Sequence, residues 1–191
     1  MKKRIFGFNV RDIAEIAILC SLAIVIDRFI KIPIASTGGS INLSMVPLYV
    51  IALRHGPFKS FIAGGIVFGF ITCLLDGYGL ICYPLEYLVS FGAVAILGLF
   101  GNYINHSFQK DTKKIFVCYS ILIVSIIVAA GIRFFCGSID SVILWEYSWP
   151  AAFAYQAPYV FISAGGVLIL MCILFPTIKM LNNVYPSSYL E

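Results

Sequence analysis

Charge is what this sequence has least of. Charged residues make up 12% of the 191 residues, whereas soluble domains usually carry about 25%. Hydrophobic residues reach 61% and the mean hydropathy is +0.97. This balance excludes an ordinary soluble domain and indicates a polytopic membrane protein. Because each span needs about 20 residues, the length accommodates five or six helices and leaves no room for a separate soluble domain.

The sequence also lacks the usual catalytic and metal-binding patterns. It contains no Walker loop, HExxH motif, Ser–His–Asp set or paired carboxylates of a hydrolase. Its six cysteines include no CxxC pair, so we expect neither a disulfide framework nor a metal site. The two histidines, His55 and His106, lie far apart in polar turns and are expected to be solvated. We therefore expect no enzymatic activity and no cofactor.

Long apolar runs separated by short polar segments predict an all-α integral membrane protein with six transmembrane helices. The basic N-terminus leads into an apolar run without a small-residue cleavage site, which favours an uncleaved first helix over a signal peptide. A single membrane domain is expected over residues 1–191, with helices at about 10–30, 43–54, 58–75, 82–104, 114–136 and 152–181.

The distribution of Lys and Arg predicts that both termini lie in the cytoplasm, because basic residues accumulate on the inner side of membrane proteins. The expected inner residues are Lys2, Lys3, Arg4, Arg11, Arg54, Lys59, Lys110, Lys113, Lys114 and Lys179. The expected outer residues are Arg28, Lys31 and Arg133. Topology and contact with anionic lipid thus explain the net charge of +4. No nucleic-acid motif is present, and we expect no nucleic-acid partner.

Acids and aromatic rings gather on the expected outer side. The acids are Asp27, Asp76, Asp140 and Glu146, together with Glu86 at the start of the fourth helix. The rings are Tyr78, Tyr83, Tyr87, Trp145, Tyr147, Trp149 and Tyr155. Aromatic residues concentrate at membrane interfaces for amphipathic reasons alone. Acids at membrane depth, however, are costly unless they face a cavity, a partner or a ligand. Rings beside carboxylates would suit a flat organic cation.

Glu86, in the stretch "CYPLEYLVSF", is the leading candidate for such a site. Pro84 suits the first turn of a helix, where the helix dipole stabilises the Glu86 carboxylate. Glu86 would either hold a cationic ligand or pair with Arg133 or solvent. Arg133 in turn would either line the site or extend to the outer headgroups.

The residues alone do not decide the roles of three further features. Trp145 is either a stacking ring or an interfacial anchor. Gln156 carries an amide that can read the edge of a heterocycle, which is weak evidence by itself. The first helix has a small residue every three or four positions, including Ala17 and Ser21. Such a strip permits close helix contact, either within this chain or with a partner protein.

Three segments resemble the substrate-binding S components of energy-coupling factor (ECF) transporters, and most of all the thiamine-specific subfamily. The stretch "GGSINLSMVPLYVIALRHGPFKSFIAGGIVFG" is similar to the subfamily's first loop and its second and third helices. "LEYLVSF" resembles its Glu/Asp–Tyr element at the start of helix 4. "IRFFCGSIDSVILW" resembles its helix 5 segment, with a basic residue followed by a later Trp.

The resemblance implies a six-helix S-component fold with an extracellular vitamin pocket in a prokaryotic plasma membrane. The implied substrate-binding residues are Glu86, Tyr87, Arg133, Trp145 and Gln156, with Tyr78 and Tyr155 as neighbouring rings. It also implies that Ala17 and Ser21 contact a transmembrane coupling subunit. Two cytoplasmic ATPase subunits would complete the importer and hydrolyse ATP.

The sequence departs from the thiamine-specific pattern at three places. Gly137 stands where a His is common, Gln156 stands where Asn is usual, and the segment between Trp145 and Gln156 is shorter. We expect thiamine as the substrate, with a thiamine precursor or another small flat heterocycle as the alternative. A different class, a small stand-alone secondary carrier, often shows inverted repeats, and this sequence has no evident repeat.

Overall fold

Helices follow most of the chain in this computed structural model, which describes residues 7–35, 38–107 and 112–190. The elements are α1 (Val10–Phe29), β1 (Lys31–Ala35), β2 (Gly38–Asn42), α2 (Met45–Phe61), η1 (Ile62–Phe68), α3 (Gly69–Asp76), η2 (Leu80–Cys82), η3 (Tyr83–Val89), α4 (Ser90–Gly92), α5 (Ala95–Leu99), α6 (Gly101–Ser107), α7 (Thr112–Trp145) and α8 (Trp149–Val184). Of the expected inner basic residues, Lys2, Lys3, Arg4 and Lys110 lie outside the described residues.

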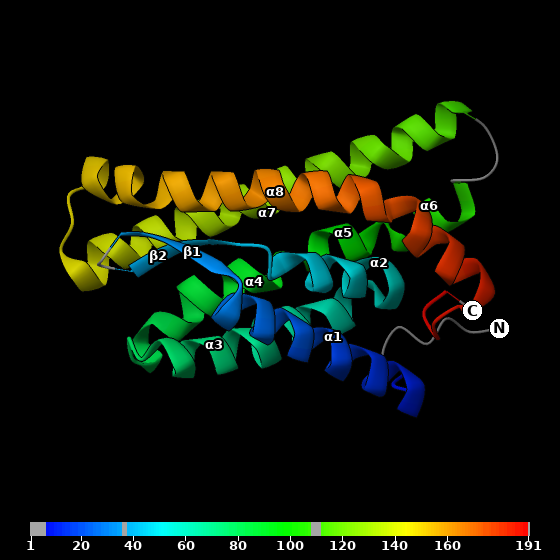
Figure 1. The fold of residues 1–191 in the computed structure, drawn as a ribbon, viewed down its shortest axis with the longest axis horizontal. Helices are drawn as coiled ribbons and strands as arrows, with labels where there is room; N and C mark the ends of the chain where they lie inside the picture. Colours follow the sequence, from blue (N-terminus) through cyan, green and yellow to red (C-terminus); the bar gives the residue numbers. More distant parts are fainter. Residues whose placement is uncertain (1–6, 36–37, 108–111, 191) are drawn as a thin grey trace.

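Within these residues, four helical stretches are long and apolar enough to cross a membrane. They are Met45–Asp76, Leu80–Ser107, Lys113–Trp145 and Trp149–Val184. The first helix, α1, is as long as a span but carries acids near both of its ends, namely Asp12, Glu15 and Asp27. The helices run along the long axis of the molecule (Figure 1).

A sharp backbone break divides the Met45–Asp76 stretch. Gly56 has φ 80° and ψ −178°, a conformation that is essentially restricted to glycine, and Pro57 follows it. Figure 1 shows α2 running away from the β-hairpin and α3 returning toward it. The break therefore separates two antiparallel segments, near the place where the sequence predicted a turn between two helices.

The later helices are longer than the sequence predicted. The helix expected at 114–136 continues to Trp145 as α7, and the helix expected at 152–181 begins at Trp149 and ends at Val184 as α8. Between them, only residues 146–148 are not helical. The added turns of α7 bury their polar side chains Asp140 and Ser141 and leave Ile143 exposed.

The β-hairpin was not expected in an all-α protein. Strands β1 and β2 pair antiparallel, with Ile32 opposite Ile41 and Lys31 opposite Asn42. A two-stranded hairpin is marginally stable alone, and here it packs on α8. Gly39, at φ 43°, lies so close to α8 that a Cβ atom on it would be 2.8 Å from Cδ1 of Tyr159.

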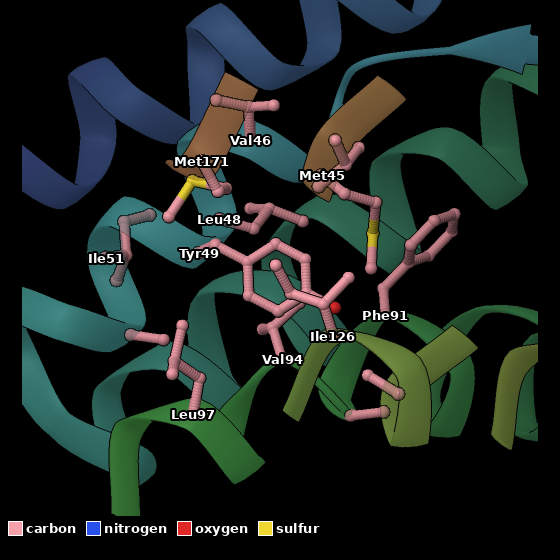
Figure 2. Packing of buried hydrophobic residues seen from close by; sticks show 14 of the residues in the cluster. Met45, Val46, Leu48, Tyr49, Ile51, Phe91, Val94, Leu97, Ile126 and Met171 are labelled. Atoms are coloured by element: carbon pink, nitrogen blue, oxygen red, sulfur yellow. The ribbon is translucent and has the colours of Figure 1, made fainter. Parts of the chain in front are cut away.

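The core centres on α2. Leu48 and Ile51 are fully buried, and Tyr49 is 2% exposed. Figure 2 shows the Tyr49 ring beside Val94 and Ile126, side chains that belong to the 80–107 stretch and to α7. Helix α2 is thus the packing centre around which the other helices gather.

At the opposite end, the turn around Gly56 is buried rather than solvated. The expectation for His55 was therefore wrong: its ring is 1% exposed, and its nitrogens lie 3.6 Å from Asp12 Oδ1 and 3.4 Å from Glu15 Oε2. Lys59 pairs with Asp12 at 2.6 Å, and Arg54 donates to both oxygens of Glu15. The correction arises because α1 packs over the turn and supplies two acids.

The C-terminal residues close the same cluster. The Ser187 hydroxyl donates to the Arg54 carbonyl, and Ser188 Oγ accepts from Lys59 Nζ at 2.7 Å. The Tyr189 hydroxyl donates to the Gly98 carbonyl at 3.3 Å. The start of α1 and the last described residues thus lie at one end, away from the hairpin (Figure 1).

Candidate functional site

A cavity of about 430 Å³ opens at the hairpin end of the molecule. It is lined by Asp27, Lys31, Pro33, Gly39, Ser40, Asn42, Thr72, Asp76, Tyr78, Cys82, Glu86, Tyr87, Phe91, Arg133, Asp140, Ser141, Trp145, Tyr147, Tyr155, Gln156 and Tyr159. All seven residues predicted to bind substrate are in this lining, although they come from four separate parts of the chain. The volume lies in the range of small-molecule sites, which is roughly 300–1,000 Å³.

Glu86 is the acid in this lining that the sequence singled out. It lies in the first turn of the π-helical segment η3, two residues after Pro84. Within the described residues, no donor forms a hydrogen bond or an ion pair with its carboxylate. The lining holds four carboxylates against two cationic side chains, Lys31 and Arg133. A half-buried carboxylate without a partner is costly, so the arrangement favours a cationic ligand.

Arg133 does not form the ion pair with Glu86 that was one alternative from the sequence. Its guanidinium carbon lies 4.9 Å from the centre of the Phe91 ring, a cation–π contact. Both side chains belong to the cavity lining. Arg133 therefore lines the cavity, which was the other possibility for its position.

Aromatic rings form much of the cavity mouth. Trp145, at the end of α7, meets Tyr78 edge to face with ring centres 5.8 Å apart. Tyr155 of α8 meets Tyr147 at 6.0 Å and Tyr159 at 5.5 Å, both nearly perpendicular. Trp145 remains 52% exposed. Such rings supply stacking surfaces of the kind that suits a flat heterocycle.

Tyr87 is held by an acid on the neighbouring helix. Its hydroxyl donates to Asp76 Oδ2 at 2.9 Å, and Arg28 donates to Asp76 Oδ1 at 2.7 Å. The Asp76 carboxylate therefore joins α1, α3 and η3 at the wall of the cavity.

A second polar network fixes the base of the hairpin. Asn42 donates to Asp27 at 2.9 Å, and its backbone N–H donates to the Ser163 hydroxyl at 3.2 Å. The Ser44 hydroxyl donates to the Asn42 side-chain oxygen at 2.7 Å. Asn42 is 5% exposed, so these bonds tie the hairpin to α1 and α8 where it covers the cavity.

Gln156 reaches from α8 to α7. Its amide nitrogen donates to the Ser141 hydroxyl at 3.2 Å, and its amide oxygen accepts from the Tyr159 hydroxyl. The structure thus brings Gln156 to the cavity, but with two of its hydrogen bonds already made within the protein.

Sequence reasoning missed several lining residues, mainly those on the hairpin. Lys31 was predicted only to lie on the outer side, and Asn42, Ser141 and Tyr159 were not singled out. The signal for the hairpin was present, because Ile32, Ile34 and Ile41 flank a Ser-Thr-Gly-Gly stretch that is typical of a tight connection between strands.

The predicted partner-contact residues lie outside the cavity. Ala17 and Ser21 are both exposed on α1, next to the exposed apolar side chains of Ile18 and Leu22. Asp12 and Asp27 of the same helix are buried. Helix α1 therefore turns Asp12 and Asp27 inward, while Ala17 and Ser21 lie on its exposed face.

Comparisons with known proteins agree with this picture. A family model described as thiamine transporter protein (Thia_YuaJ) matches residues 13–186. The thiamine transporter ThiT of Bacillus subtilis (strain 168) is 29% identical, and the match covers 85% of this chain and 89% of that protein. A solved structure of ThiT from Listeria monocytogenes superimposes with a TM-score of 0.68 at 22% identity, covering 94% of this chain and 97% of that one. At this level of identity, the similarity to the Listeria structure shows only that the two chains share a fold.

Proposed function

This chain belongs to the thiamine transporter protein family, and from that membership we propose that it is the thiamine-binding S component of an ECF importer. The family match confirms the resemblance found in the sequence. Together with the apolar helices, it identifies a multi-pass protein of the cell membrane. The substrate, the roles of the cavity residues and the partner subunits are argued below.

The observation that carries the proposal is the Glu86 carboxylate in an aromatic-walled cavity, where residues 7–35, 38–107 and 112–190 offer it neither a hydrogen bond nor an ion pair. Thiamine combines a cationic thiazolium ring with an aminopyrimidine ring, both flat. Glu86 would hold the cationic ring system, and Trp145 and Tyr87 would pack against it through stacking and cation–π attraction. Arg133 would order the acids or bind a polar substituent of the ligand.

We propose six spans with both termini in the cytoplasm. The reversal at Gly56 supports this number, because it divides the Met45–Asp76 stretch into two antiparallel segments, and α1 adds one more. In this orientation the cavity faces outward. The buried cluster around Arg54 and Lys59 then lies at the cytoplasmic end, which agrees with the positive-inside rule.

The partners in this proposal are a transmembrane coupling subunit and two cytoplasmic ATPases. The outward face of α1, with Ala17 and Ser21 exposed, supports close contact with another helix in the membrane. After capture from outside, the whole subunit would reorient against the coupling subunit and release thiamine inward. ATP hydrolysis on the partners would drive the cycle.

Two measurements test this function. Equilibrium dialysis of the purified chain in detergent should show saturable thiamine binding. If the chain binds a thiamine precursor but not thiamine, the proposed substrate is wrong. In proteoliposomes, the chain alone should not accumulate thiamine. Uptake should require the coupling and ATPase subunits with ATP. Accumulation by the chain alone under an ion gradient would identify a secondary carrier instead.

A further inference from the structure

Residue 137 is a glycine, although the backbone conformation at this position does not require glycine. It lies inside α7 and has no positive φ angle. Since glycine is a poorer helix former than alanine, its presence here needs another explanation. The explanation is space: a Cβ atom at residue 137 would lie 2.6 Å from Gln156 Nε2 and 2.7 Å from Gln156 Oε1. The amide of Gln156 therefore fills the volume that any larger residue at 137 would need.

The Gln156 amide cannot simply move aside. Its side chain is 2% exposed and is bonded on both ends, to Ser141 and to Tyr159. The clash with a side chain at 137 would therefore break at least one of these bonds or push the amide into the cavity.

The hydrogen bonds also fix the direction of this amide. The Ser141 hydroxyl donates its hydrogen to the Gly137 carbonyl at 2.8 Å. Its oxygen can therefore only accept from its other neighbour, so the Gln156 nitrogen must face it at 3.2 Å. The Gln156 oxygen then faces Tyr159 and accepts the hydrogen of that hydroxyl. The chain runs from Tyr159 through Gln156 and Ser141 to a backbone carbonyl.

This direction decides what Tyr159 offers to a ligand. Its only hydroxyl hydrogen is used on Gln156, so toward the cavity the hydroxyl presents an acceptor oxygen. Gln156 keeps one N–H donor and one lone pair. A ring edge whose amino group faces Tyr159 can donate a hydrogen to the Tyr159 oxygen. A ring oxo group at the same place would instead bring its own acceptor oxygen against the Tyr159 oxygen.

We propose that Gly137 is a specificity-determining position: by leaving room for Gln156, it lets the Tyr159–Gln156–Ser141 chain select ligands with an amino-substituted ring edge over the oxo equivalent. The inference rests on the proposed function, because thiamine carries such an aminopyrimidine edge. Gly137 and Ser141 are positioning residues, since they act through Gln156 and Tyr159.

The test compares two ligands on four proteins. Equilibrium dialysis measures the dissociation constants of thiamine and of its analogue with a ring oxo group in place of the amino group. The proteins are the original chain, Gly137→Ala, Ser141→Ala and the control Gly131→Ala. Gly131 also lies in α7, but a Cβ there would meet no atom within 4 Å. Gly131→Ala therefore adds the same methyl group without touching Gln156.

The original chain and Gly131→Ala should prefer thiamine over the oxo analogue by the same factor. Gly137→Ala and Ser141→Ala should each lower this preference about tenfold, the value of one displaced hydrogen bond. An unchanged preference in Gly137→Ala, with thiamine still bound, overturns the inference and leaves the proposed function intact. If Gly137→Ala fails to fold, the preference of Ser141→Ala tests the inference instead, because this variant removes the acceptor of the Gln156 amide nitrogen without adding volume. Failure of the original chain to bind thiamine overturns both.

Discussion

Arg28, near the end of α1, donates to Asp76, at the end of α3, across 2.7 Å, and the same carboxylate accepts from Tyr87. Residues 48 positions apart thereby join the hairpin end of the first helix to the wall of the cavity. Because α1 also carries the exposed small residues proposed to face the coupling subunit, this ion pair is a direct physical connection between the two regions.

Asp76→Asn should lower stability through this junction. Arg28 and Asp76 are each about one quarter exposed, so their pair contributes less than about 1 kcal/mol. The buried Tyr87 hydroxyl loses a charged acceptor, and we expect a total loss of about 1–2 kcal/mol. Thermal unfolding of the purified protein in detergent measures it. The control is Glu146→Gln, because Glu146 is exposed in the 146–148 connection; equal midpoints for the two variants would contradict the expectation.

Glu86→Gln should weaken thiamine binding without destabilising the protein. The carboxylate has no partner within the described residues, so the free protein loses no contact. The bound cation, by contrast, loses a charged neighbour, and we expect an affinity decrease of about 10- to 100-fold. Equilibrium dialysis measures the affinity and thermal unfolding measures the stability. If Glu86→Gln binds thiamine as tightly as Glu146→Gln does, Glu86 does not contribute to thiamine binding.

Lys59→Met should strongly destabilise the opposite end. Lys59 is fully buried and pairs with Asp12, which is 2% exposed. Removing one partner leaves a buried charge and should cost about 3–5 kcal/mol, whereas an apolar replacement of both residues restores much of the loss. The double variant Asp12→Leu with Lys59→Met should therefore unfold at a higher temperature than Lys59→Met alone.

The control for this cluster is Lys113→Met, because Lys113 is exposed at the start of α7. It should leave the thermal midpoint unchanged. A Lys59→Met midpoint equal to that of Lys113→Met would show that the buried pair contributes nothing.

Gly56→Ala should be more damaging than Gly77→Ala. Both glycines have positive φ, 80° and 76°, so alanine costs backbone energy at each, about 1–2 kcal/mol in the left-handed region. At Gly56, however, ψ is −178° and a Cβ would lie 2.7 Å from the Tyr189 ring, while at Gly77 it would meet nothing within 4 Å. Expression and thermal unfolding of the two variants compare the costs, and equal losses would argue against a steric role for Tyr189.

Hydropathy and residue chemistry predicted the helical character of the chain and the residues around the cavity. Glu86, Arg133, Trp145 and Gln156 were singled out because their side chains stand out in or beside apolar stretches, and the resemblance to the thiamine-specific S components implied the full set of seven. Their shared cavity is a finding of the structure, and their roles in binding remain predictions.

The remaining features depend on contacts that single-sequence patterns do not contain. The burial of Arg54 and Lys59 results from acids on α1 that lie about 40 residues earlier in the chain. The hairpin is stable because it packs on α8, more than 100 residues later. The fit between Gly137 and Gln156 likewise exists only once α7 and α8 lie side by side, so no local pattern indicates it.

The central claim is that a thiamine cation binds beside Glu86 and Trp145, and tryptophan fluorescence tests it most directly. The chain has two tryptophans; Trp145 lines the cavity, and Trp149 does not. Thiamine should quench the fluorescence of Trp149→Phe, which retains only Trp145, in a saturable way. It should leave the fluorescence of Trp145→Phe unchanged. Quenching that persists in Trp145→Phe, or that is absent from Trp149→Phe, would contradict binding in this cavity.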